Sequence, residues 1–237
     1  EKGVVKDQEF AQKLDAVYAP EQTIAALKRQ KQWARAGEIY ASLNRNKEAA
    51  RMFRKAGDKK RSAMEWGKAG KTLKAARMLE RLGDYGTAAR FYAEKGKHLK
   101  AALAYGKLND LPSAAEAYAQ AKKFPLAAET FLNFFASPGA DAEAQTRAAE
   151  KAYALLQNQE AREKLAPESL KALAIAVAMR FAALKRDDLA AQLFIGAGDY
   201  GRAGELYARN GQMERAAECM ARAGKVKEAA EFLGRFH

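Results

Sequence analysis

The chain has 237 residues, of which 49% are hydrophobic and 30% charged, so it is long enough to bury a core and too apolar for general disorder. Alanine, leucine and charged residues dominate and prolines are few, which favours helix almost everywhere and predicts no sheet. The formal net charge is +13, which favours anionic binding partners.

Cys219 is the single cysteine, which excludes an intramolecular disulfide and a cysteine-based metal cluster. The longest apolar run, residues 173–179, is far shorter than the roughly 20 residues that a membrane-spanning helix needs. These features predict a cytoplasmic protein with no transmembrane segment. Because the sequence does not open with Met, a removed signal segment is left open.

Residues 1–30 contain two helix-like patches, 7–18 and 21–30, with Pro20 at the start of the second. A clear repeat then places a small residue at every thirteenth position: Gly37, Ala50, Ala63, Ala76, Ala89, Ala102, Ala115 and Ala128. Three residues further along stands a large apolar residue: Tyr40, Phe53, Trp66, Leu79, Tyr92, Tyr105, Tyr118 and Phe131. Seven residues after the small one comes a glycine or asparagine: Asn44, Gly57, Gly70, Gly83, Gly96 and Asn109.

Each unit of this repeat predicts one helix of about ten residues and a tight turn, since Gly and Asn tolerate the left-handed conformation that closes a helix. A helix of three turns cannot bury its apolar stripe alone, so the units must stack. Paired small residues such as Ala88 and Ala89 let the next helix approach closely, and the large residue fills the groove between helices. We expect an all-α fold, a right-handed α-solenoid of short antiparallel hairpins with 13 residues per helix and 26 per hairpin.

The repeat is interrupted between residues 136 and 186. Asp141 is expected to cap a longer helix, 141–157, and Pro167 to open another that ends near residue 185. The repeat resumes with Ala191, Gly204, Ala217 and Ala230 as the small residue and with Phe194, Tyr207, Met220 and Leu233 as the large one. We therefore expect an N-terminal repeat array (1–135), an irregular corner (136–186) and C-terminal repeats (187–237). A further stretch of chain, or self-association, is expected to cover the last helix, because solenoids normally end in a capping unit.

The pattern small-small-x-x-aromatic-x-x-x-Gly, as in AARFYAEKG (88–96) and AGELYARNG (203–211), resembles tetratricopeptide-type repeats. It is more similar to the shorter hairpins of the coatomer and intraflagellar-transport class of α-solenoids. The resemblance covers roughly residues 34–133 and 187–237 and implies a scaffold for protein contacts. The hairpin here spans two units of thirteen and is shorter than the roughly 34 residues of a tetratricopeptide repeat, so the peptide-binding residues of the longer repeat do not carry over.

No group of residues predicts catalysis, a cofactor or a metal site. The G-x-G-x-x-G pattern at residues 196–201 matches a dinucleotide fingerprint, but a predicted helix precedes it where that motif requires a strand. We expect His98 to be a solvated turn residue, Cys219 a small buried hydrophobe and Asp187 with Asp188 a helix cap. The aromatic residues of the repeat are expected to pack in the core and not to stack on bases.

Positive charge is concentrated in residues 45–107, which hold 18 Lys and Arg against 6 Asp and Glu. Stacking of the units is expected to align these charges into a basic stripe made of Arg51, Arg54, Lys55, Lys59, Lys60, Arg61, Lys68, Lys71, Lys74, Arg77 and Arg81.

The first hypothesis is a non-enzymatic scaffold or adaptor whose basic stripe meets an acidic protein partner, an extended or helical segment. The alternative is an α-solenoid that binds nucleic acid or another anionic ligand through the same stripe. A third account is that these charges only keep an alanine-rich surface soluble.

Overall fold

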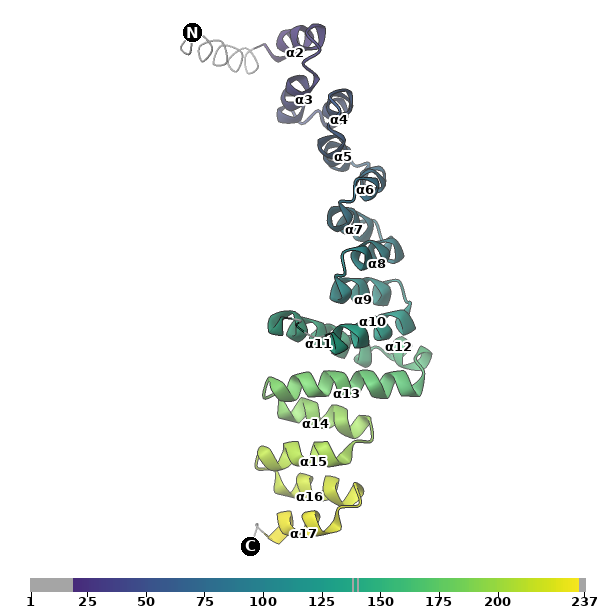
Figure 1. The fold of residues 1–237 in the computed structure, drawn as a ribbon, viewed down its shortest axis with the longest axis vertical. Coiled ribbons are helices and arrows are strands. Elements are labelled where there is room, and N and C mark those ends of the chain that lie inside the picture. Colours follow the sequence, from purple (N-terminus) through teal and green to yellow (C-terminus); the bar gives the residue numbers. More distant parts are fainter. Residues whose placement is uncertain (1–18, 138, 140, 235–237) are drawn as a thin grey trace, which may run out of the picture. The chain divides into compact units, whose positions relative to one another are not determined.

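The structure is a computed structural model in which residues 19–137, 139 and 141–234 are described. Every regular element within these residues is a helix, as predicted (Figure 1). Contacts between residues divide the chain into two compact units, Glu1–Leu108 and Asn109–His237, called here unit 1 and unit 2. The helical patch predicted at 7–18 lies outside the described residues. Among the helices that are described, none is long and apolar enough to cross a membrane.

Unit 1 consists of short helices that follow the predicted repeat. They are α2 (Pro20–Arg29), α3 (Trp33–Ser42), α4 (Asn46–Lys55), α5 (Lys59–Lys68), α6 (Thr72–Arg81), α7 (Tyr85–Glu94) and α8 (His98–Lys107). Within the unit, each helix from α2 to α7 packs on the next helix along the chain. From α3 to α8 every helix has ten residues and starts thirteen residues after the previous one, so two consecutive helices form a hairpin of the predicted length.

Ion pairs also join alternate helices of unit 1. Arg61 of α5 lies 2.7 Å from Glu38 of α3, and Lys107 of α8 lies 3.4 Å from Glu80 of α6. The odd-numbered helices therefore lie beside one another in one layer and the even-numbered helices in a second layer, as the two offset rows of Figure 1 show. Consecutive helices belong to different layers.

The small pair of each repeat is buried, as predicted, except in the last repeat, where Ala229 is buried and Ala230 is exposed. In α7, for example, Ala88 and Ala89 are both fully buried. The closing residues adopt positive φ angles, 56° at Asn44 and 77° at Gly83. Lysine also occupies this position, which the sequence analysis did not anticipate: Lys31, Lys122 and Lys185 have φ angles of 56° to 57°. The local repeat therefore determines where each helix ends.

Most of the large residues are buried as predicted, with three exceptions. Tyr105 and Tyr118 are only partly buried, and α8 and α9 instead bury Ala104 and Ala117, one residue earlier. Leu233 is 50% exposed, because it lies on α17, the last helix of the described chain.

Unit 2 begins with two repeat helices, continues with longer ones and ends with four repeat helices. Its helices are α9 (Leu111–Gln120), α10 (Phe124–Ala136), α11 (Ala142–Gln157), α12 (Gln159–Lys164), α13 (Pro167–Ala183), α14 (Asp187–Gly196), α15 (Tyr200–Arg209), α16 (Met213–Arg222) and α17 (Val226–Gly234). Asp141 caps α11 as predicted, by accepting a hydrogen bond from the Ala144 N–H. The short α12 was not predicted. It is capped by Asn158, which accepts from the Ala161 N–H at 2.9 Å.

The long helix α13 changes the packing within unit 2. It packs against both α10 and α11, so here a helix contacts elements that are not its neighbours along the chain. The Tyr153 ring of α11 meets the Phe181 ring of α13 edge-on, with centroids 5.5 Å apart. One apolar core runs through the unit from Ala115 to Cys219.

Candidate binding surface

Each helix of unit 1 from α3 onward has one side stripe of four residues: the residue before the helix and its third, sixth and tenth residues. The spacing of three, three and four residues puts them on one side of a helix, and all are exposed or half-buried. Because consecutive helices belong to different layers, equivalent stripes within one layer recur at every second helix, once per hairpin.

The two layers carry very different charge on these stripes. Ten of the twelve stripe positions on α4, α6 and α8 are basic and one is acidic: Arg45, Glu48, Arg51, Lys55; Lys71, Lys74, Arg77, Arg81; Lys97, Lys100, Leu103, Lys107. The twelve positions on α3, α5 and α7 hold four basic and four acidic residues: Gln32, Arg35, Glu38, Ser42; Asp58, Arg61, Met64, Lys68; Asp84, Thr87, Arg90, Glu94. The positive charge of residues 45–107 therefore lies mainly on the even-numbered layer.

All eleven residues of the predicted basic stripe are exposed, but they divide between the two layers. Seven belong to α4, to α6 or to the turn before α6: Arg51, Arg54, Lys55, Lys71, Lys74, Arg77 and Arg81. The other four lie on α5: Lys59, Lys60, Arg61 and Lys68.

The basic residues of α5 are largely neutralised. Lys60 lies 2.8 Å from Asp84, and Lys68 lies 2.6 Å from the buried Glu65. Arg61 pairs with Asp58 as well as with Glu38. Hydrogen bonds from Arg61 lower the pKa of the Asp58 carboxyl, as the Lys60 ammonium does for the pKa of Asp84. Lys60 and Arg61 thus connect neighbouring repeats, Lys68 pairs within α5, and Lys59 forms no ion pair among the described residues.

The seven residues of α4 and α6 form no ion pair within the described part of the chain. Two of them lie over aromatic rings instead. The Lys55 Nζ lies 4.6 Å from the centroid of Trp33, and the Lys74 Nζ lies 3.4 Å from that of Trp66. The other five extend into solvent and make neither kind of contact with the described residues: Arg51, Arg54, Lys71, Arg77 and Arg81.

A cation eight residues after a buried ring is a recurrent contact of this fold. The cation is the third residue of its helix and the ring belongs to the helix before: Phe53 with Arg61, Trp66 with Lys74, Tyr92 with Lys100, Phe194 with Arg202 and Tyr207 with Arg215. Cation–π contacts of this kind stabilise folded proteins, so part of the positive charge is structural. This pattern was not predicted, although its spacing of eight residues is visible in the sequence.

Four basic residues of the even-numbered layer were not part of the predicted basic stripe: Arg45, Lys97, Lys100 and Lys107. They occupy the same stripe positions as the predicted residues, one hairpin away along the chain. These positions recur with the hairpin period and not with the helix period.

Acidic side chains on the even-numbered layer are already engaged. Glu48 accepts from Arg45. Glu80 accepts a 2.7 Å hydrogen bond from the Tyr92 hydroxyl and pairs with Lys107. The tyrosine hydroxyl lowers the pKa of Glu80, while burial and the neighbouring Glu80 raise the pKa of Tyr92 to about 12. Glu48 also interacts electrostatically with Arg51, but neither carboxylate forms an ion pair with Arg77 or Arg81 among the described residues.

The residues considered for catalysis or ligand binding have structural roles. For His98 and for the pair Asp187 and Asp188, these roles differ from the expected ones. Asp187 and Asp188 do not cap α14 but form its first turn, where the buried Asp187 pairs with Arg209 and Asp188 accepts from Gln212 at 2.7 Å. His98 opens α8 and is half-buried, with an Nδ1 that is shielded from solvent and has no hydrogen-bond partner among the described residues. It is therefore a half-buried helical residue and not a solvated turn residue.

Two further expectations are confirmed. Cys219 is buried, and burial raises the pKa of its thiol. The G-x-G-x-x-G stretch joins the end of α14 to the start of α15, and Gly198 is the closing residue of the repeat with a φ of 76°. A helix therefore stands where a dinucleotide site would need a strand.

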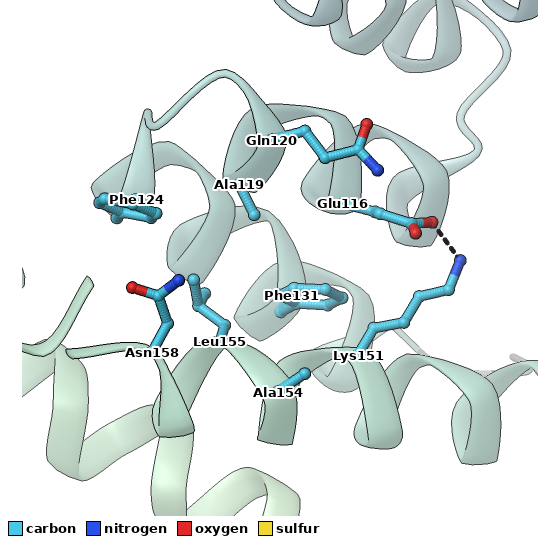
Figure 2. Close-up of a pocket in the computed structure, with 9 residues that line it drawn as sticks. All are labelled: Glu116, Ala119, Gln120, Phe124, Phe131, Lys151, Ala154, Leu155 and Asn158. Atoms are coloured by element: carbon cyan, nitrogen blue, oxygen red, sulfur yellow. Dashed lines mark hydrogen bonds and ion pairs between the residues drawn. The ribbon is translucent and has the colours of Figure 1, made fainter. Parts of the chain in front are cut away.

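Unit 2 has a pocket of about 310 Å³ between α9, α10 and α11 (Figure 2). Phe124, Phe131 and Leu155 form its apolar wall. The ion pair between Glu116 and Lys151 closes one side. The carboxylate and the ammonium are thus engaged with each other, and the apolar wall suits an apolar side chain better than a charged ligand.

No protein-family model and no curated protein matches this chain.

Proposed function

We propose that unit 1 is a non-enzymatic interaction scaffold that binds an acidic protein segment on the stripes of α4, α6 and α8. The observation that supports this most directly is the contrast between ten basic and one acidic residue on these stripes and four of each on α3, α5 and α7. The stacked hairpins of ten-residue helices also support the resemblance to the short-hairpin, coatomer-type α-solenoids, whose role is to hold protein partners.

Solubility alone does not explain this distribution. A high net charge keeps a protein soluble wherever the charges lie, whereas like charges gathered on one layer repel each other. Here acidic residues pair with Lys60, Arg61 and Lys68 of α5, whereas Arg51, Arg77 and Arg81 form no ion pair among the described residues. An anionic partner would relieve that repulsion.

An acidic protein segment fits this surface better than a nucleic acid does. Phosphates would be attracted by the same charges, but sequence-tolerant binding of single strands also uses exposed rings on which bases stack. Of the rings beside the basic stripes, Trp66 and Tyr92 are buried in the repeat core, whereas Trp33 and Tyr85 are half-buried and already lie under Lys55 and Lys107. Nucleic-acid binding is therefore the alternative that the experiment below must distinguish.

The test is a pull-down from cell extract, run with and without nuclease treatment, that compares the wild-type chain with a charge-reversed variant. The triple change Lys71→Glu, Arg77→Glu and Arg81→Glu alters three residues of the α6 stripe that have neither an ion pair nor a ring contact among the described residues. The matched control, Arg90→Glu, Lys171→Glu and Lys227→Glu, changes the net charge equally at exposed residues outside these stripes.

We expect the wild-type chain and the control to recover the same acidic proteins and the α6 variant to lose them. Equal recovery by the α6 variant would remove the stripes from the mechanism. Recovery that disappears on nuclease treatment would show that the partner is a nucleic acid.

A further inference from the structure

The position of Arg61 beside Glu38 reveals which stripe residues meet across a layer. Arg61 is the third residue of α5, Glu38 is the sixth residue of α3, and their side chains are 2.7 Å apart. The two are 23 residues apart along the chain. This spacing therefore brings the third position of one helix to the sixth position of the helix two before it.

On the even-numbered layer the same spacing matches basic residues with each other. Arg51 of α4 corresponds to Lys74 of α6, and Arg77 of α6 corresponds to Lys100 of α8. Where α3 and α5 are joined by an ion pair, these helices are expected to present two pairs of like charges. Like charges at such positions destabilise the free protein, and Glu48 near Arg51 and Glu80 near Lys100 offset only part of that repulsion.

One member of each pair is held in place by a ring. The Lys74 Nζ lies 3.4 Å from the Trp66 centroid and the Lys100 Nζ 5.7 Å from the Tyr92 centroid. The lysines have therefore lost part of their side-chain freedom before any partner binds, which favours binding. The arginine of each pair, Arg51 or Arg77, is exposed and free to close on an anion.

The row of pairs ends in apolar side chains. Leu103 occupies the sixth position of α8, where Arg51 and Arg77 stand on the two previous even-numbered helices, and it is 54% exposed. Leu99, one turn earlier, is 42% exposed. The sixth residue of the helix is thus basic on α4, basic on α6 and apolar on α8.

We propose that the two pairs are equivalent carboxylate clamps for one extended acidic segment that crosses α4, α6 and α8. Helices packed side by side are about 8 to 10 Å apart. A segment in the polyproline II conformation advances about 3.1 Å per residue and has three residues per turn, so every third side chain lies on the same side. The segment therefore carries acidic side chains three residues apart and an apolar side chain three residues beyond them, which meets Leu103. This inference rests on the proposed function and specifies the partner.

The test measures binding of labelled peptides of equal composition to the full chain by fluorescence anisotropy. The peptides are Glu-x-x-Glu-x-x-Leu, its reverse, a peptide with adjacent glutamates and one with glutamates six residues apart. We expect one of the first two to bind about fivefold more tightly than the last two, since each clamp adds a charge-assisted contact. Equal affinity of all four peptides would contradict the proposal that the two pairs act as carboxylate clamps.

Two double variants separate the clamps from general charge. Arg51→Gln with Arg77→Gln removes one arginine from each clamp, whereas Arg54→Gln with Arg81→Gln removes the same charge from the same helices outside the clamps. We expect only the first variant to abolish the spacing preference, and Leu103→Ser to reduce affinity only for peptides that carry the leucine. If both double variants weakened binding equally, the inference would be wrong and the proposed function would stand. If neither variant altered any binding, the proposed function itself would fail.

Discussion

The Lys74 ammonium lies 3.4 Å from the centroid of the Trp66 ring, eight residues earlier on the preceding helix. This contact places a side chain of the basic stripe and a side chain of the repeat core against each other. A basic residue in this protein can therefore serve stability, binding or both, and substitutions separate these roles.

Replacing Lys74 should weaken the fold, whereas replacing Arg77 on the same helix should not. We expect Lys74→Ala to lower the free energy of unfolding by about 0.5 to 1 kcal/mol, the range of an exposed cation–π contact. Lys74→Arg should keep most of this cation–π stabilisation. Arg77→Ala is the matched control, because Arg77 contacts no ring and forms no ion pair among the described residues. Urea denaturation measures all three, and equal losses for Lys74→Ala and Arg77→Ala would contradict the assignment.

The close approach of neighbouring helices depends on the small pair. Ala89 is fully buried between helices and Arg90 beside it is exposed. Ala89→Leu should destabilise unit 1 by about 1 to 3 kcal/mol through overpacking. Arg90→Leu should change stability by no more than about 0.5 kcal/mol, as surface substitutions usually do. Thermal unfolding followed by circular dichroism distinguishes the two, and an Ala89→Leu chain as stable as the wild type would mean that this seam is loosely packed.

The ion pair of Asp187 with Arg209 should stabilise unit 2 more than the contacts of Asp188 do. Asp187 is only 8% exposed, and removing one partner of a buried pair leaves the other charge uncompensated. Because Arg209 is more than half exposed, we expect Asp187→Ala to cost about 1 to 2 kcal/mol, below the range of a fully buried pair. Asp188→Ala, at an exposed neighbour, should cost less than half of that in the same denaturation assay.

Acid should destabilise the links between repeats of unit 1. The pKa values of Asp58 and Asp84 are lowered in the fold by Arg61 and Lys60, from an ordinary value of 3.8. A lowered pKa gives stability that is present above the ordinary value and is lost as pH falls through the folded value.

Melting temperatures should therefore drop as pH falls below about 4, where aspartate carboxyls begin to bind protons. The variant Asp84→Asn keeps an oxygen to cap α7 but carries no charge, so its melting temperature should fall less steeply than that of the wild type. Parallel curves for the two chains would show that the pair of Asp84 with Lys60 does not contribute.

The candidate surface illustrates how far a repeat can be interpreted from a sequence. The helix period of thirteen predicted the burial of Ala89 and the closing turn at Gly83 correctly, because both depend on contacts within one helix and its neighbours. The same period grouped Lys60 and Arg61 with Arg77, although they lie in different layers. The hairpin period, twice as long, would have separated them.

The sequence by itself determined the helices, because a small pair, a large residue and a closing Gly or Asn act locally and recur in a fixed order. Only the tertiary structure decided which charges remain free. Whether Arg61 is neutralised depends on Glu38, which is 23 residues away and comes close only when α3 and α5 lie side by side. Likewise, the packing of α13 against α10 depends on the lengths and directions of three helices together, and no local pattern specifies that.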